Sequence, residues 1–168
     1  MALVVSVQER STTHYVGIPV TARFSEFCAS DGPNEMIPRV YQWLADHDVT
    51  PQGGPLYVYR HFGSNRDEPV DLTVAVPVPG PVKPSNGLVL GSLPAGSYVV
   101  GRFTGHPDGI SACQPEITEW AESEDLRLGG LIAEDGTTWT GYIEHYLTDP
   151  ADEPDPSKWT IELLFKTT

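Results

Sequence analysis

Three residues near the end of the chain, Tyr142, Glu144 and Tyr146, have the types and the spacing of a receptor for a flat cation. In a β-strand every second side chain lies on the same face, so the carboxylate lies between the two tyrosines. A cation over a tyrosine ring gains roughly 0.5–2 kcal/mol per contact. A partly buried carboxylate without a partner has a raised pKa, and a bound cation relieves the cost of its burial. If this face lines a cavity, we expect it to bind flat cations of several shapes.

A similar strand occurs earlier in the chain. The segment GPLYVYRHFG near residue 57 is echoed by WTGYIEHYLTD near residue 142, and a gapless alignment places Tyr57 on Tyr142, Tyr59 on Glu144 and His61 on Tyr146. Only the second copy carries the acid. We expect the two aromatic faces to meet across a pseudo-two-fold axis. The alternative is a solvent-facing glutamate among surface tyrosines, which is the commoner situation on an antiparallel strand.

The echo extends outward and predicts that each half of the chain contains two strands, a helix and two further strands. In the first half we expect strands at 3–8, 13–22, near 57 and at 70–78, with a helix within 30–49. In the second half we expect strands at 88–93, 96–105, near 142 and at 158–166, with a helix within 106–126. The helical spacing of Ile110, Cys113, Ile117 and Trp120 supports the second helix.

These elements predict a single α+β domain over residues 1–168, with pseudo-repeats at about 2–78 and 88–167 and a proline-rich linker at 78–87. The alternative is chance similarity, since any chain of strands and helices repeats apolar strands. We expect both helices to pack on one face of the sheet. The tyrosine face would then be the opposite one, which has no cover other than a ligand.

Composition narrows the class of ligand. The chain has 168 residues, 23 acidic against 10 basic side chains, and a net charge of −13. No basic stripe offsets this charge, so nucleic acids and anionic membranes are disfavoured partners, and a cationic or neutral small molecule is favoured. Acidity that serves only solubility is the alternative. Cys28 and Cys113 lie far apart without a CxxC motif, and no signal peptide is recognisable, which indicates the cytoplasm.

Motifs for catalysis, metals and phosphates are missing from the sequence. There is no G-x-S-x-G elbow and no H-x-x-x-H pair among the five histidines, and neither phosphate-binding glycine motif occurs. No run approaches the roughly 18 apolar residues that a transmembrane helix needs. We therefore expect no metal, no cofactor and no membrane span.

The chain resembles the GyrI-like small-molecule-binding domains, which also form the effector-binding domain of multidrug-responsive transcription regulators. The resemblance rests on SLPAGSYVVGRFTG (92–105), ITEWAESEDL (117–126), YIEHYLTDP (142–150) and WTIELLFK (159–166). It implies a duplicated β-α-β-β fold of the SHS2 type, a curved antiparallel sheet with two main helices on one face, and a ligand cleft between the halves.

The resemblance also implies site residues. The glutamate of the matching strand contacts cationic aromatic ligands in this family, and here that residue is Glu144. Aromatic residues flank the ligand, and the best-matched positions are Tyr57, Tyr59, Tyr142, Tyr146 and Trp159. Trp120 either lines the cleft floor or belongs to the core. Glu162, on the closing strand, either faces the interior and assists binding or is a solvent-facing or paired acid.

Three functions remain open at this point. The first is capture or sensing of flat aromatic, cationic or amphipathic compounds by a stand-alone member of the family, since the resemblance begins near residue 2 without a preceding helix-turn-helix. The second is hydrolysis of cyclopropane-containing genotoxins, as in some relatives, with Glu144 acting on water in the same cleft. The third is a protein partner such as DNA gyrase, bound through the acidic surface.

Overall fold

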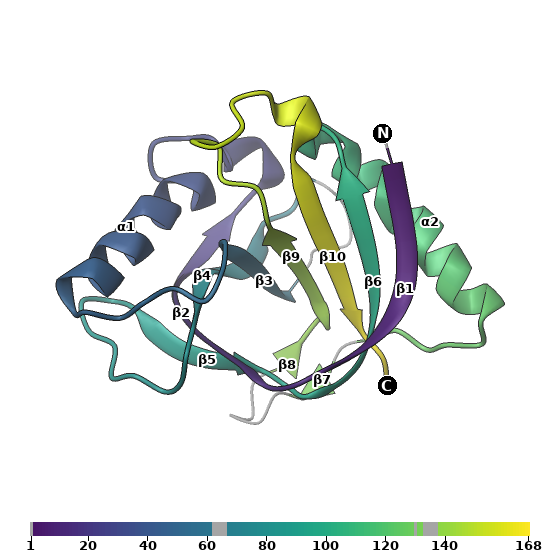
Figure 1. The fold of residues 1–168 in the computed structure, drawn as a ribbon, viewed down its shortest axis with the longest axis horizontal. Coiled ribbons are helices and arrows are strands. Elements are labelled where there is room, and N and C mark those ends of the chain that lie inside the picture. The colour runs from purple at the N-terminus through teal and green to yellow at the C-terminus, as the bar shows by residue number, and fades with distance from the viewer. Residues whose placement is uncertain (1, 62–66, 130, 133–137) are drawn as a thin grey trace.

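A computed structural model describes residues 2–61, 67–129, 131–132 and 138–168 of the chain (Figure 1). The elements of the first half are β1 Ala2–Arg10, β2 Thr13–Ala22, α1 Pro33–Asp46, β3 Leu56–His61 and β4 Val70–Val78. Those of the second half are β5 Val89–Leu93, β6 Gly96–Thr104, α2 Ile110–Ser123, β9 Tyr142–Tyr146 and β10 Thr160–Lys166. A short hairpin pairs β7 Leu131–Ile132 with β8 Thr138–Trp139, and three 3₁₀ turns are η1 Phe24–Glu26, η2 Pro107–Gly109 and η3 Pro156–Lys158.

Eight strands form one curved antiparallel sheet in the order β1-β6-β10-β9-β3-β4-β2-β5. The α+β class, the curved sheet and the two main helices agree with the prediction. The order is symmetric about the β9–β3 pair when corresponding strands of the two halves are compared. The first strand of each half nevertheless pairs with the other half, β1 with β6 and β5 with β2.

The two main helices correspond closely in sequence. Each has 14 residues, with a proline at its sixth position and a tryptophan at its eleventh: Pro38 and Trp43 in α1, Pro115 and Trp120 in α2. This correspondence and the symmetric strand order support the proposal that the chain is an internal duplication.

The helices cover the two ends of one face of the sheet and leave its middle open. Val40, Trp43 and Leu44 of α1 pack on Val16 of β2 and Val76 of β4. At the other end α2 packs on β6 and β1, with Ile117 above Gly101, where an added Cβ would lie 2.3 Å from the isoleucine side chain. The central strands β3 and β9 therefore have no helix directly above them.

The tyrosine face is the face that carries the helices, so the expectation that it is the opposite one was wrong. Tyr57, Tyr59 and Tyr142 belong to the same buried cluster as Met36 of α1 and Ile117 of α2. The other face is closed by the curvature of the sheet. Its apolar side chains come from the middle and both ends of the sheet and from β8, and they form a second core: Tyr15, Leu56, Val58, Ala75, Leu93, Tyr98, Val100, Trp139, Ile143 and Leu164.

Candidate ligand-binding site

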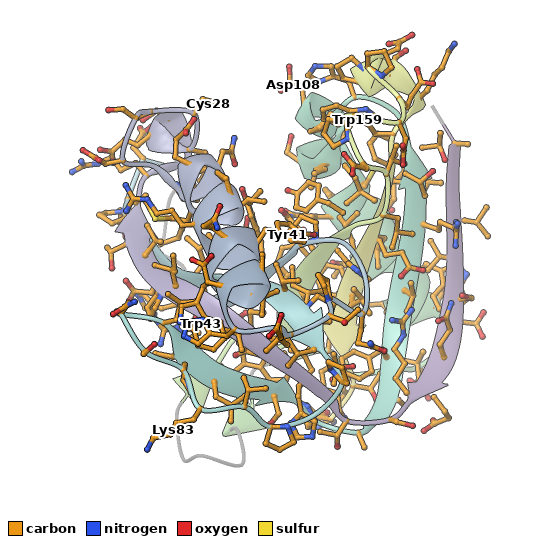
Figure 2. The ribbon with its side chains drawn as sticks, turned by 60° about the vertical axis from the view of Figure 1, so that its left-hand side comes forward. Cys28, Tyr41, Trp43, Lys83, Asp108 and Trp159 are labelled. Carbon is orange, nitrogen blue, oxygen red and sulfur yellow. The ribbon has the colours of Figure 1, made fainter. Side chains whose placement is uncertain are left out.

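A cleft of about 1420 Å³ opens between the helices, above strands β3 and β9. Figure 2 shows Cys28 and Tyr41 on the wall that contains α1, with Asp108 and Trp159 on the facing wall. The side chains that line the floor and walls include Phe24, Phe27, Asn34, Ile37, Tyr41, Tyr57, Tyr59, Ile110, Gln114, Glu144, Tyr146, Asp149 and Trp159.

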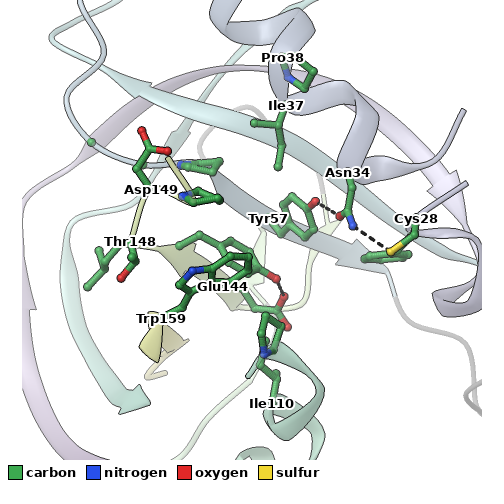
Figure 3. A pocket seen from close by; sticks show the side chains of 18 of the residues that line it. Cys28, Asn34, Ile37, Pro38, Tyr57, Ile110, Glu144, Thr148, Asp149 and Trp159 are labelled. Carbon is green, nitrogen blue, oxygen red and sulfur yellow. Dashed lines mark hydrogen bonds between the residues drawn. The ribbon is translucent and has the colours of Figure 1, made fainter. Parts of the chain in front are cut away.

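Glu144 lies at the floor of this cleft (Figure 3). Its strand neighbours are Tyr57 on β3 and Leu163 on β10, and only 5% of the residue is exposed. Three tyrosine hydroxyls donate hydrogen bonds to its carboxylate. Oε1 accepts from Tyr59 at 3.0 Å and from Tyr146 at 2.8 Å, and Oε2 accepts from Tyr142 at 2.6 Å.

Burial dominates the electrostatics of this carboxylate. It raises the pKa of Glu144, and the hydrogen bonds from Tyr142, Tyr146 and Tyr59 oppose the rise without cancelling it. Burial, followed by the charge of Glu144, raises the pKa of all three tyrosines, so they keep their protons and remain donors. Among the ion pairs of the described residues, none includes Glu144.

The helices hold two of the tyrosines from above. Asn34 of α1 accepts a hydrogen bond from the Tyr57 hydroxyl, and Gln114 of α2 donates one to the Tyr142 hydroxyl at 3.0 Å. The rings also support one another: Tyr59 stacks on Tyr142 with centroids 5.3 Å apart, and Tyr57 meets Tyr146 edge to face at 5.1 Å. The aromatic floor is therefore fixed before any ligand arrives.

Five of the predicted site residues line the cleft: Tyr57, Tyr59, Glu144, Tyr146 and Trp159. The Trp159 indole is fixed at the rim by a 2.6 Å hydrogen bond from its Nε1 to the Glu153 carbonyl. Tyr142 does not line the cleft. It is buried and acts on the site through its hydrogen bond to Glu144.

Glu162 lies outside the cleft, on the opposite face of the sheet. Leu163, and not Glu162, is the β10 neighbour of Glu144, and successive side chains of a strand point to opposite faces. Glu162 instead pairs with Arg10 at 3.3 Å, Arg102 at 3.8 Å and His145 at 3.9 Å. The geometry gives it no contact with a ligand in this cleft.

Two further residues singled out in the sequence do not line the cleft. Trp120 packs against the buried cluster beneath α2 and does not line the cleft, so it is a core residue. His61 is exposed, because the register of β3 against β4 shifts between Tyr59 and His61 and breaks the alternation of faces.

The wall residues were not found from the sequence. Asn34, Tyr41 and Gln114 come from the helices, Asp108 comes from η2, and Asp149 comes from the loop after β9. Asp149 belongs to the Tyr-x-Glu-x-Tyr-Leu-x-Asp-Pro stretch, which was the available signal for this residue. For the helix residues, the apolar stripes predicted which side of each helix is buried but not that a polar neighbour borders a cleft.

Other candidate sites are few. Within the described ranges no group of three or more histidine, cysteine or acidic side chains is placed to hold a metal ion. None of the helices in the described part of the chain is long and apolar enough to cross a membrane.

The chain is similar to a known family and to several solved structures. The sequence model of the GyrI-like small molecule binding domain matches residues 6–167. None of the curated proteins with which the chain was compared matches it. The C-terminal domain of EcmrR has a similar structure, with a TM-score of 0.76 and 16% identity over 100% of this chain and 99% of that domain. In a complex of EcmrR with DNA the TM-score is 0.75 at 15% identity, and the match covers 98% of this chain but only 57% of that one.

Two further structures are similar. SAV2435, solved bound to tetraphenylphosphonium, has a TM-score of 0.59 and 15% identity over 98% of this chain and 93% of its own. A hydrolase from Listeria innocua has a TM-score of 0.64 and 14% identity over 98% of this chain and 91% of its own. At these identities the structures share the fold.

Proposed function

Because the chain belongs to the family of GyrI-like small molecule binding domains, we propose that it binds flat aromatic or amphipathic cations and thereby sequesters or senses them. The observation that carries this proposal is the Glu144 carboxylate. It lies buried at the floor of an aromatic cleft and has no cationic side chain paired with it among the described residues.

The charge of the cleft favours a positive ligand. Its described lining includes the carboxylates of Asp108, Glu144 and Asp149 and no lysine, arginine or histidine. A buried carboxylate is costly without a countercharge, and a cation that displaces water from the cleft supplies one. An anion of the same shape would be repelled.

The walls favour a broad range of aromatic shapes. Tyr57, Tyr146 and Trp159 offer ring faces or edges, on which a cation gains roughly 0.5–2 kcal/mol per contact. The volume of about 1420 Å³ exceeds the several hundred Å³ of most drug-sized pockets. The tetraphenylphosphonium bound to SAV2435 is such a cation, and it is a suitable probe for this protein.

The hydrolase alternative has less support. A carboxylate that activates water needs a free lone pair directed at that water, and three tyrosine hydroxyls already occupy three of the about four acceptor positions of Glu144. These hydrogen bonds favour a Glu144 that acts as a fixed negative charge over one that accepts a proton from water.

We further propose a cytoplasmic location and no nucleic-acid partner. Cys28 and Cys113 are both free thiols, which suits a reducing compartment. The net charge of −13 would repel a phosphate backbone.

Calorimetric titration of the wild type and Glu144→Gln with tetraphenylphosphonium tests the proposal. We expect the substitution to weaken binding by about 10- to 150-fold, since a hydrogen-bonded charged partner contributes roughly 1.5–3 kcal/mol. Equal affinity of the two proteins would refute the proposal.

Two controls isolate the charge. Glu162→Gln removes another buried glutamate from the neighbouring strand but on the opposite face, so it should leave the affinity unchanged. Tetraphenylborate has nearly the shape of tetraphenylphosphonium and the opposite charge. The wild type should bind it at least tenfold more weakly, and Glu144→Gln should reduce that preference.

A further inference from the structure

We propose that Gln114 on α2 is a positioning residue that holds Glu144 in its ionised, cation-accepting form through Tyr142. This inference rests on the proposed cation-binding function of the cleft. It concerns a residue that lines the cleft but does not touch the carboxylate itself.

The hydrogen bonds from Gln114 to Glu144 form a chain with one direction. Gln114 Nε2 donates to the Tyr142 hydroxyl at 3.0 Å, and that hydroxyl donates to Glu144 Oε2 at 2.6 Å. A tyrosine hydroxyl has a single proton. Once it is given to the carboxylate, the oxygen can only accept, so the amide must present its N–H₂ group.

Burial holds the Tyr142 side chain in place between Gln114 and Glu144. Only 3% of the residue is exposed, and its ring lies against Tyr59 at 5.3 Å and Phe165 at 4.8 Å between centroids. Gln114 is half-buried and lines the cleft, whereas Tyr142 does not. The amide is therefore the link between this buried hydroxyl and the ligand space.

The direction of these two hydrogen bonds favours the ionised form of Glu144. A hydroxyl that accepts a bond donates its own proton more strongly, so Gln114 strengthens the bond that stabilises the carboxylate. If Glu144 were protonated and donated to Tyr142, the Tyr142 proton would need another acceptor, and Gln114 could provide one only by turning its amide so that the carbonyl replaces the N–H₂ group. Gln114 therefore disfavours the neutral acid, which cannot attract a cation.

Other titratable groups also face this carboxylate. Tyr57 and Tyr59 approach from β3, and on β9 Tyr146 flanks Glu144 on the side away from Tyr142. Asp108 and Asp149 lie farther out among the lining residues. Because these groups are the same in the wild type, Gln114→Met and Gln42→Met, they shift the absolute titration of Glu144 but not the difference between these proteins.

The test compares Gln114→Met with Gln42→Met. Methionine keeps the length of the side chain and removes its donor. Gln42 also lines the cleft, from α1, but it donates to Asp46 at 2.8 Å. Carbon-13 NMR of labelled glutamate would follow the Glu144 titration in the free protein, and tetraphenylphosphonium affinity would be measured across pH.

For Gln114→Met we expect the Glu144 midpoint to rise by about half a pH unit, because part of one hydrogen bond's contribution is lost. Tetraphenylphosphonium keeps its charge at every pH, so its affinity should fall about threefold on the acid side and match the wild type well above the midpoint. Gln42→Met should leave the Glu144 midpoint unchanged, and any change in its affinity should be of equal size at every pH. Gln114→Glu, which accepts from Tyr142 instead of donating, should shift the midpoint further in the same direction.

An unchanged Glu144 midpoint in Gln114→Met, or an affinity loss of equal size at every pH, would overturn the proposal and leave Gln114 a packing role. Should Gln114→Met fail to fold, Gln114→Leu, which also lacks the donor and adds no charge, provides the same comparison. If the wild type does not bind tetraphenylphosphonium, the proposed function fails. The titration of the free protein would still report on Gln114.

Discussion

The buried charge of Glu144 favours the binding of a cation but lowers the stability of the free protein. Its carboxylate is buried beneath the cleft, and the pKa is raised because three tyrosine hydroxyls replace water incompletely. A charge held this way is available to a ligand but costs free energy in its absence.

The expected consequence is that Glu144→Gln stabilises the free protein at neutral pH. A folded-state pKa above the unfolded value means that proton binding stabilises the fold below the unfolded pKa, and that this contribution is lost as pH rises through the folded pKa. Glutamine does not titrate, so the variant does not lose stability in this way as pH rises. Thermal unfolding without ligand should give a melting temperature about 2–4 °C higher for the variant near pH 7 and equal values near pH 4.

Glu162→Gln is the matched comparison for that experiment. It breaks the pairs with Arg10 and Arg102, so it should lower the melting temperature at pH 7, where burial, by lowering the pKa of His145, leaves that third neighbour largely uncharged. A melting temperature of Glu144→Gln below that of the wild type at pH 7 would contradict the proposed cost of the Glu144 charge.

At the residue scale, the sequence was informative where two neighbouring positions share a strand. The period of two placed Glu144 with Tyr146, and the internal echo added Tyr57 and Tyr59. It left Glu162 open between a cleft residue and a paired acid, because periodicity within β10 does not say which of its faces joins the face of Glu144. Gln114 could not be found, since its partner lies 28 residues away on another element.

At the element scale, the two helices share an unusual feature. Each carries a proline at its sixth position, where the missing N–H leaves the carbonyl four residues earlier without its helical donor. Those carbonyls belong to Asn34 and Ser111, and both residues line the cleft.

We expect Pro115→Ala to stabilise the protein by about 1 kcal/mol, because alanine restores the hydrogen bond to Ser111 and has the higher helix propensity. Pro115 is exposed, so little packing is lost. Urea unfolding would measure the change.

Pro33→Ala is the control. Pro33 occupies the first helical position, where proline is well tolerated, and it is buried. It should therefore give no gain, and a similar gain at both sites would contradict the explanation.

The elements themselves were predicted well. The helices expected within 30–49 and 106–126 occupy Pro33–Asp46 and Ile110–Ser123, and the predicted strands are present. The error concerned the side of the sheet. An apolar stripe predicts that a helix packs on a sheet, but two helices at opposite ends can leave an open cleft on the very face that they share.

At the scale of the whole molecule, the charge of −13 should act on the rate at which ligands arrive. An acidic surface attracts cations over distances that salt screens, about 10 Å at 0.1 M. We expect the association rate of tetraphenylphosphonium to fall several-fold between about 20 and 300 mM salt. Stopped-flow fluorescence of the tryptophans, with Trp159 at the rim, would follow it.

Glu144→Gln removes one of 23 acidic residues and should retain a similar proportional salt dependence of association, while its dissociation becomes faster. An association rate that does not change with salt would restrict the acidity to a role in solubility.

The pairing of strands between the two halves could not be predicted from the sequence. The echo identified which strands correspond, but strand partners depend on contacts between distant segments. The first strand of each half therefore had no sequence signal for its place beside the other half.

That exchange of first strands determines how the protein can be assembled and divided. During synthesis β1 emerges early, but its partner β6 follows only after the whole first half, since Ala2 pairs with Thr104 and Arg10 with Gly96. Long-range pairing of this kind slows folding. A protease cut between residues 79 and 87 would produce two fragments that each lack a strand that the other holds. Neither fragment could complete its share of the sheet alone, whereas the two together could rebuild it by complementation.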